Sequence, residues 1–285
     1  VCSSDLGITN KIMLAEIRRQ QKLSQSIVDA QTAVSTGVTL NKPSDNALAW
    51  VQVSDIGRAQ AQQAAWQTNV SYGTTRAGNA EANLSEIDNL LTRAQELITS
   101  ARNGSLNDTS RAAIVEEMST IRTTVSELLN QKDYQGVSVF DDQQSVLVPV
   151  SRGLNLAVVG TKQEVSEGID VNGTPMSIDD ILNQAITALE GGNDTEIASG
   201  LEAVQAAQSH IAVEQAKQGV RSDRLEVIGT RLTEVDTDLS ERRSTLESTD
   251  LTKVISTLQA QLLQLDAAQS AYARINQQTL FDLIN

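Results

Sequence analysis

Apolar side chains near the carboxyl end of the chain recur at alternating steps of three and four residues. This is the spacing of a helix that packs along a seam. The series is Leu251, Val254, Leu258, Gln261, Leu265, Ala268, Tyr272, Ile275 and Thr279, with one clearly polar position at Gln261. Leu262, Leu263, Leu283 and Ile284 fall beside the seam. The predicted helix therefore carries more apolar surface than one partner helix covers.

A similar apolar stripe lies near the amino end of the chain. Its positions are Met13, Ile17, Leu23, Ile27, Ala30 and Val34, with Gln20 as a mismatch. The stripe stops before Gly37, where we expect the left-handed cap of a helix. Residues 1–6 do not join the pattern, and we leave them outside the predicted fold.

The segment 46–102 contains no proline and keeps helical periodicity throughout, at apolar positions that include Leu84, Ile87, Leu91 and Ile98. At 1.5 Å per residue such a helix would reach roughly 80 Å, too long for a small spherical domain. Ser44 or Asp45 is placed to cap its first turn. Gly73 and Gly78 predict a kink or a close contact between helices.

A shorter return helix follows the break at 103–108. Asp108 or Thr109 can cap it, and we expect it to pack antiparallel against the long helix. The period then changes between residues 141 and 176, where short runs of β-branched residues alternate with glycine. This segment predicts a small knob of strands.

Helical periodicity resumes after the knob. Ser177 begins a capping-box pattern, and the helix that it opens should end near Gly191 and Gly192. A second very long helix is predicted from about Asp194 to about Thr245, with an apolar pattern that includes Ile211, Val213, Val220, Leu225 and Leu232. Its outer face alternates in charge, which is typical of a solvated helix.

These segments predict a mainly α fold, namely an elongated rod of long antiparallel helices. The expected parts are an N-terminal assembly helix at 1–45, a long helix with its return helix at 46–140, the knob at 141–176, C-terminal rod helices at 177–245 and a C-terminal assembly helix at 246–285. Because the two ends carry matching seams, we expect them to pair like a coiled coil at one tip. The strand-containing knob would then lie at the other tip.

Composition and charge narrow the choice of function. Aromatic residues are only 2% of the chain and prolines number 3, which is typical of helices packed side by side. A net charge of −14 argues against nucleic-acid binding, because phosphates would repel the chain. No apolar run approaches the roughly 18 residues needed to span a bilayer, so no membrane insertion is expected.

The chemistry-bearing residues favour a protein that is not an enzyme. One cysteine, Cys2, and one histidine, His210, cannot form a disulfide or a zinc site of about four ligands within one chain. The adjacent acidic pairs at 116–117 and 179–180 point to different faces and cannot act as catalytic pairs. We therefore expect no catalytic residue, no metal site and no cofactor.

Several motifs occur in the order found in one known family. Residues 33–47 read AVSTGVTLNKPSDNA, residues 84–97 read LSEIDNLLTRAQEL, residues 103–105 read NGS and residues 130–137 read NQKDYQGV. On these motifs the chain resembles the bacterial flagellins and flagellar hook-associated proteins, over nearly its whole length outside the knob.

Two branches of that family remain open. Residues 101–111, ARNGSLNDTSR, and residues 275–284, INQQTLFDLI, are similar to the branch that forms the hook–filament junction. The motif at 84–97 is shared with filament flagellins, and Ala49 with Trp50 departs from the junction pattern. Remoter alternatives are a surface adhesin or glycan-binding flagellin homologue, and a coiled-coil scaffold unrelated to flagella.

The resemblance implies a structural subunit of the extracellular flagellum, exported by the type III route without a cleaved signal peptide. Its expected partners are further copies of itself, the other axial proteins (hook, junction proteins and flagellin) and an export chaperone. We also expect the terminal helices to be largely unpaired in the free chain and to order on polymerisation. The predicted assembly interface comprises Ile17, Leu23, Ile27, Val34, Leu251, Val254, Leu258, Leu262, Leu265, Tyr272, Ile275, Leu280 and Phe281.

Overall fold

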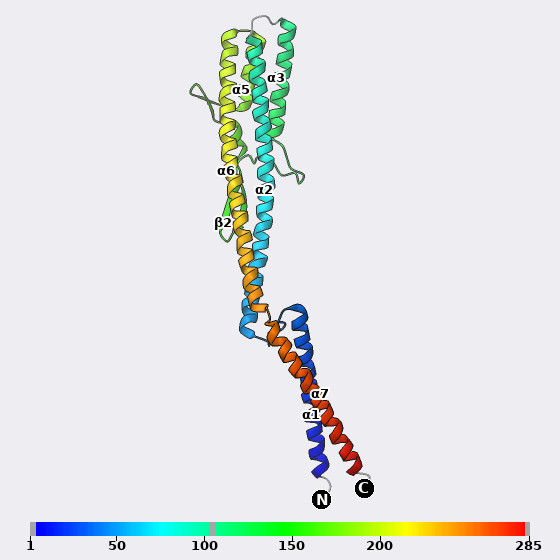
Figure 1. The fold of residues 1–285 in the computed structure, drawn as a ribbon. Helices are drawn as coiled ribbons and strands as arrows, with labels where there is room; N and C mark the ends of the chain where they lie inside the picture. The colour runs from blue at the N-terminus through cyan, green and yellow to red at the C-terminus, as the bar shows by residue number, and fades with distance from the viewer. Residues whose placement is uncertain (1–3, 103–106, 283–285) are drawn as a thin grey trace. The chain divides into compact units, whose positions relative to one another are not determined.

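The computed structural model describes residues 4–102 and 107–282, with side chains described for 14–102 and 107–274. Its helices are α1 Ser4–Thr36, α2 Ala47–Arg102, α3 Asp108–Leu129, α4 Lys162–Ser166, α5 Ile178–Gly191, α6 Asp194–Glu247 and α7 Leu251–Asp282. Its strands are β1 Val146–Ser151, β2 Leu154–Val159, β3 Ile169–Val171 and β4 Thr174–Met176 (Figure 1). The predicted mainly α class is confirmed. The first helix begins at Ser4, well before the periodic stripe.

The chain forms two compact units. One contains residues up to Gln60 together with those from Thr237 onward, and the other is Ala61–Asp236. Both boundaries fall inside long helices, so the first unit includes the start of α2 and the end of α6 as well as α1 and α7.

The second unit has a continuous apolar core between α2, α3, α5 and α6. On α2 the predicted apolar positions Leu84, Ile87, Leu91 and Ile98 are fully buried. Helix α3 returns along α2, where the Asn83 amide donates a 3.0 Å hydrogen bond to the Leu128 carbonyl. Each buried Leu or Ile contributes about 1.5–3 kcal/mol, so this stripe is a principal source of stability.

Helix α6 buries only part of the apolar line that its hydropathy suggests. Ile211, Gln218, Leu225 and Leu232 are buried, whereas Val213, Val220 and Val227 are exposed. The prediction that Val213 and Val220 belong to the core pattern is wrong. Gln218 occupies the core-facing position because its side-chain amide donates a 2.8 Å hydrogen bond to the Val158 carbonyl.

Asparagines, rather than the predicted residues, cap two helices. Asn46 accepts a 3.1 Å hydrogen bond from the Ala49 amide, and Asn107 accepts one of 2.8 Å from the Ser110 amide. Asp45 cannot also cap α2, because its carboxylate accepts the amides of the loop before it. The predicted caps at the two ends of α5 are confirmed, with Ser177 at its start and a left-handed Gly192 at its end.

The knob consists of two antiparallel hairpins, β1–β2 and β3–β4, with α4 between them. It packs on the flank of α2, where a Cβ at Gly73 would lie 3.2 Å from side-chain atoms of Val158 and Leu225. Gly73 therefore marks a close contact, whereas no atom lies within 4 Å of the corresponding position at Gly78.

The predicted position of the knob at a tip is wrong. Gly73 lies 29 residues before Arg102, which is roughly 43 Å along a helix. The end of this unit is formed instead by the last turn of α2, the first turn of α3 and the turn at Gly192 (Figure 1). The strands lie on the flank because their buried side chains need the apolar surface that α2 and α6 provide there.

Candidate assembly interface

Helices α1 and α7 lie antiparallel in the first unit, and main-chain contacts hold the segments that lead into them. The Thr39 amide donates a 2.9 Å hydrogen bond to the Glu247 carbonyl, and the Thr249 amide donates one of 3.1 Å to the Gly37 carbonyl. Gly37 has a φ of 72°, which gives α1 the predicted left-handed cap. These bonds fix where the two terminal helices begin to pair.

The helix pair covers only part of the two predicted seams. On α7 the half-buried positions are the seam residues Val254, Leu258, Gln261, Leu265, Ala268 and Tyr272, and none of them is fully buried. On α1, Ile27 and Ala33 are buried, Leu23, Ala30 and Val34 are half-buried, and Ile17 is exposed. The pair therefore covers one stripe on each helix and leaves the neighbouring surface open.

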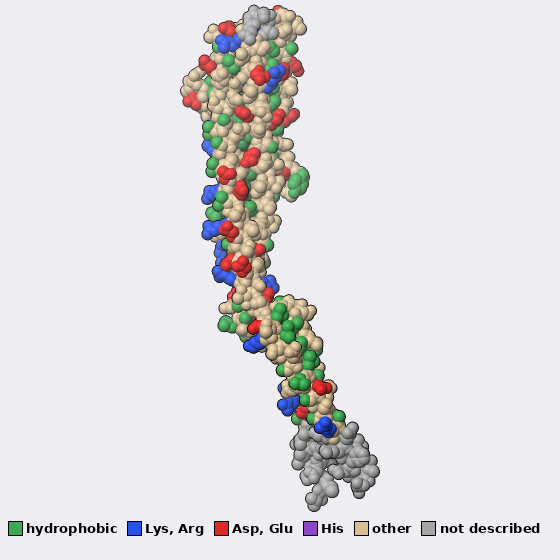
Figure 2. Space-filling view, viewed as in Figure 1, with side chains coloured by type: hydrophobic (Ala, Val, Ile, Leu, Met, Phe, Trp, Pro, Cys, Tyr) green, Lys and Arg blue, Asp and Glu red, His purple; other side chains and the backbone are tan. Residues whose placement is uncertain are grey.

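Large apolar side chains are exposed around this stripe. Leu263 is 72% exposed and Leu48, at the start of α2, is 71% exposed. The others are Leu14, Val28, Val51, Ile255 and three predicted interface residues, Ile17, Leu251 and Leu262. Figure 2 shows green side chains gathered on the surface of this unit.

The structure exposes two apolar residues that the predicted interface does not include, and part of that interface lies outside the described side chains. Leu48 and Val51 are exposed, and the signal that could have pointed to them is that both are apolar, three residues apart and just after a capping loop. Ile275, Leu280 and Phe281 belong to the predicted interface, but their side chains lie outside the described residues.

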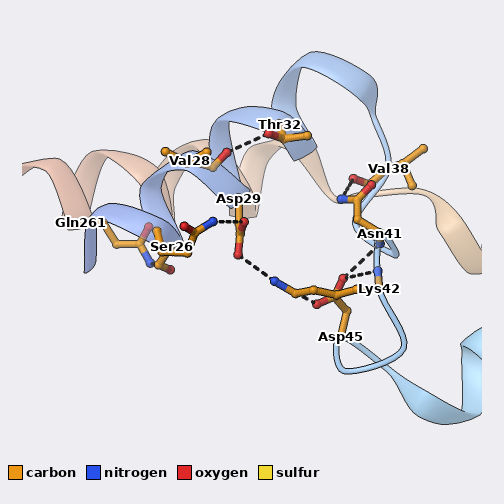
Figure 3. A network of polar contacts seen from close by, with 10 residues as sticks. Ser26, Val28, Asp29, Thr32, Val38, Asn41, Lys42, Asp45 and Gln261 are labelled. Carbon is orange, nitrogen blue, oxygen red and sulfur yellow. Dashed lines mark hydrogen bonds and ion pairs between the residues drawn. The ribbon is translucent and has the colours of Figure 1, made fainter. Parts of the chain in front are cut away.

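The loop between α1 and α2 is held by a polar network (Figure 3). Lys42 Nζ lies 3.1 Å from Asp29 Oδ2, while Asp45 Oδ2 accepts 3.0 Å hydrogen bonds from the amides of Asn41 and Lys42. The hydrogen bond from Gln25, and then the contact with Lys42, lower the pKa of Asp29. The same contact with Asp29 raises the pKa of Lys42. Because these charges are exposed, the network orders the loop rather than stabilising the unit strongly.

Two glutamines weaken the pair formed by α1 and α7. Gln20 Nε2 and Gln261 Oε1 are buried and have no hydrogen-bond partner in the described part of the chain. An unsatisfied buried polar atom costs about 1–3 kcal/mol. The structure differs from the expectation of unpaired terminal helices, because both seams fit one antiparallel register. The pair that they form is nevertheless only half-buried and polar in places.

The remaining candidate residues make structural contacts. His210 Nε2 lies 2.9 Å from the Glu164 carbonyl oxygen, and Arg122 donates two 2.7 Å hydrogen bonds to Asp179. Within residues 14–102 and 107–274 no group of His, Cys, Asp and Glu side chains is arranged to hold a metal ion. None of the helices in the described part of the chain is long and apolar enough to cross a membrane.

Comparison with known proteins points to flagellar components. Residues 8–145 match the family described as the bacterial flagellin N-terminal helical region. The chain is 25% identical over 289 residues to flagellar hook-associated protein 3 of Salmonella typhimurium, which covers 88% of this chain and 90% of that protein. It is 28% identical over 176 residues to phase 1 flagellin of Salmonella naestved, covering 58% of this chain but 34% of that protein.

A solved structure shares the fold. The crystal structure of flagellar hook-associated protein 3 from Legionella pneumophila superposes with a TM-score of 0.61 at 14% sequence identity. The match covers 68% of this chain and 98% of the Legionella chain.

Proposed function

The chain belongs to the family of bacterial flagellins and flagellar hook-associated proteins, and from this premise we propose that it is the structural subunit that joins hook and filament. The observation that carries the proposal is the extent of the similarity. The alignment with hook-associated protein 3 covers 90% of that relative, whereas the flagellin alignment covers 34% of the flagellin. The similarity thus extends over nearly the whole of hook-associated protein 3 but over only about a third of the flagellin.

The proposed assembly interface is the first unit. Its paired helices leave Leu48, Leu262 and Leu263 exposed beside half-buried seam residues. Burying one such leucine contributes about 1.5–3 kcal/mol, while ordering one residue costs roughly 1–2 kcal/mol. The free chain is therefore close to balance in this region, and the neighbouring subunits supply the burial that favours the assembled state. Head-to-tail contacts of this kind produce open helical growth.

Partners and location follow from the same proposal. The subunit binds further copies of itself and other axial proteins of the flagellum, on the extracellular part of that structure. The same proposal includes export by the type III route. An export chaperone covers the exposed apolar residues of α1 and α7 before export, since such a surface promotes aggregation in the cell.

The alternative of a filament flagellin is supported by the match of residues 8–145 to the flagellin N-terminal region. The number and position of the copies in a flagellum distinguish a junction subunit from a filament flagellin. Immunogold labelling of isolated flagella should detect the chain only at the hook–filament boundary if it is the junction subunit. Labelling along the whole filament would contradict the junction proposal.

The assembly mechanism is tested by two substitutions on α7 in cells that lack their own copy. Leu263→Asp changes a residue that the single chain leaves exposed, so the free chain should stay folded while its incorporation into flagella falls. Leu265→Asp also disrupts the seam between α1 and α7 and should block incorporation.

Immunoblots of isolated flagella and of the growth medium separate incorporation from export. Ala113→Asp on α3, an exposed position in the second unit, is the matched control and should incorporate normally. Normal incorporation of Leu263→Asp and Leu265→Asp would overturn the proposed interface.

A further inference from the structure

The exposed side of α6 in the second unit carries a regular apolar column. Val213, Val220 and Val227 follow one another at intervals of seven residues and are 52%, 67% and 67% exposed. Each comes two residues after a buried side chain, at 211, 218 or 225. Two residues correspond to 200° around a helix, so the column lies on the side opposite the core.

A second column of three cations runs beside the valines. Lys217, Arg224 and Arg231 also lie seven residues apart and are exposed, although Lys217 Nζ forms a 2.6 Å ion pair with the buried Glu214. In Figure 2 blue side chains form a line along the α6 edge of this unit. Together the two columns form a valine–cation stripe of six residues.

The stripe adds an apolar column to the charged outer face of α6. Valine has a lower helix propensity than Lys, Glu or Ala, because its branched side chain loses χ1 freedom against the preceding turn. Single exposed valines are ordinary, but a repeat of seven with charges alongside is the pattern by which one helix packs on another. The stripe therefore has the chemistry of an unpartnered helix-packing surface.

The chain itself supplies a surface of complementary charge. It has 36 acidic and 22 basic residues, and Figure 2 shows red side chains over α6 and α2 beside the blue edge. Glu81 of α2 is exposed and accepts a hydrogen bond from the Ser222 hydroxyl of α6, which places a carboxylate between the two helices. Glu226, one turn after Ser222, is also exposed.

We infer that the valine–cation stripe of one copy packs against the acidic α2–α6 face of a second copy in the assembled flagellum. The contact joins two different patches and so repeats from copy to copy without closing. Three valines cannot supply the burial of about 800 Å² per partner found in stable complexes. The contact therefore forms only between copies that the terminal helices already hold together. The inference rests on the proposed assembly function.

The first test measures incorporation into flagella relative to export into the medium. Val220→Glu should lower the incorporated fraction about tenfold, because it places a carboxylate against an acidic partner surface. Thr120→Glu on α3 is the matched control, since it replaces another exposed, β-branched helical residue with the same charge change. Arg224→Glu should lower incorporation and Lys132→Glu should not. Equal incorporation of Val220→Glu and Thr120→Glu would overturn the inference.

The second test identifies the surface that the valine–cation stripe contacts. A photo-crosslinking amino acid at position 220 should join two copies of this chain in isolated flagella, and peptide mapping should find the partner site on α2 or α6. Cross-links only to flagellin or to a hook protein, or to a different face of the second copy, would overturn the inference.

The substitutions separate this inference from the proposed function. Failure of Leu265→Asp to block incorporation would count against the proposed function. Normal incorporation of Val220→Glu, when Leu265→Asp is blocked, would overturn this inference alone.

Discussion

The side-chain amide of Gln261 on α7 donates a 2.8 Å hydrogen bond to the hydroxyl of Ser26 on α1, across 235 positions of sequence. The one strongly polar position of the α7 seam is thus matched to a small polar residue on the opposing helix. A polar pair within an apolar seam specifies register at a cost in stability. The two terminal helices therefore favour one alignment over alternatives shifted along the seam.

Replacing this glutamine should strengthen the pair. In Gln261→Leu the unsatisfied Oε1 is removed and apolar surface is added, so we expect stabilisation of the α1–α7 pair by about 1–2 kcal/mol. Hydrogen exchange of the α7 backbone amides in the isolated chain should slow correspondingly. Gln264→Leu, at an exposed position of the same helix, should leave exchange nearly unchanged. Unchanged or faster exchange in Gln261→Leu would show that the hydrogen bond to Ser26 outweighs both effects.

A buried ion pair anchors the loop after α3. Arg76 and Asp133 have side chains only 4% and 7% exposed and lie 3.0 Å apart, and Arg76 also donates to the carbonyl of Ser138. Asp133→Ala leaves the guanidinium without its counter-charge, so the free energy of unfolding should fall by about 3–5 kcal/mol. Urea denaturation measures this change. Arg93→Ala, which breaks exposed ion pairs on the same helix, should cost at most about 1 kcal/mol.

Two helical glycines should respond to alanine in opposite directions. A Cβ at Gly200 would lie 3.1 Å from the Cα of Ala185 on α5, so Gly200→Ala forces two helices apart and should destabilise by about 1–3 kcal/mol. Gly78 has no atom within 4 Å of the new Cβ, and Gly78→Ala should stabilise by up to about 1 kcal/mol. The midpoint of thermal unfolding should fall in Gly200→Ala and rise in Gly78→Ala. A loss of stability in Gly78→Ala would contradict the prediction.

The contact between Arg122 and Asp179 should make stability depend on pH. The two hydrogen bonds from Arg122 lower the pKa of Asp179, so this carboxylate stays charged in the folded chain when unfolded aspartates, with pKa values of about 3.9, begin to bind protons. Its stabilisation is therefore complete above that value and is lost as the pH falls through the lowered pKa.

The comparison variant is Asp179→Asn. It should be less stable than the parent chain at pH 7 by at most about 1 kcal/mol, since the pair is partly exposed, and the difference should shrink as the pH falls below the ordinary aspartate pKa of about 3.9. Urea denaturation at pH 7, 5 and 3 measures it. Asp223→Asn, at an exposed aspartate of α6, serves as the control. A difference of the same size at every pH would assign the effect to helix packing rather than to charge.

The helices were predictable from sequence because periodicity and capping chemistry act locally. The line Leu84, Ile87, Leu91 and Ile98, and the caps at Gly37 and Ser177, follow from residue type and spacing alone. Choices between neighbouring residues were not predictable. Asn46 caps α2 because Asp45 is occupied by the loop amides, which depends on how the loop folds.

Polar residues at core positions account for the main wrong predictions from the sequence. Gln218 is buried and bonded to a strand carbonyl, so a hydropathy pattern assigns Val220 to the core in its place. The position of the knob depends on a contact between segments far apart in sequence, at Gly73, which no local pattern reports. The half-buried seam was predictable on α7, whereas the exposure of Leu48 depends on what packs around the start of α2.

The antiparallel seam between α1 and α7 limits which insertions and deletions α7 can tolerate. Deleting one residue between Leu258 and Leu265 would rotate every later side chain of α7 by about 100° relative to α1. The half-buried positions after the deletion would then turn toward solvent, and polar ones would face Leu23 and the part of α1 before it. Insertions and deletions in this helix should therefore persist only as whole heptads, whereas the β1–β2 turn at Gly153 can lengthen without disturbing the seam.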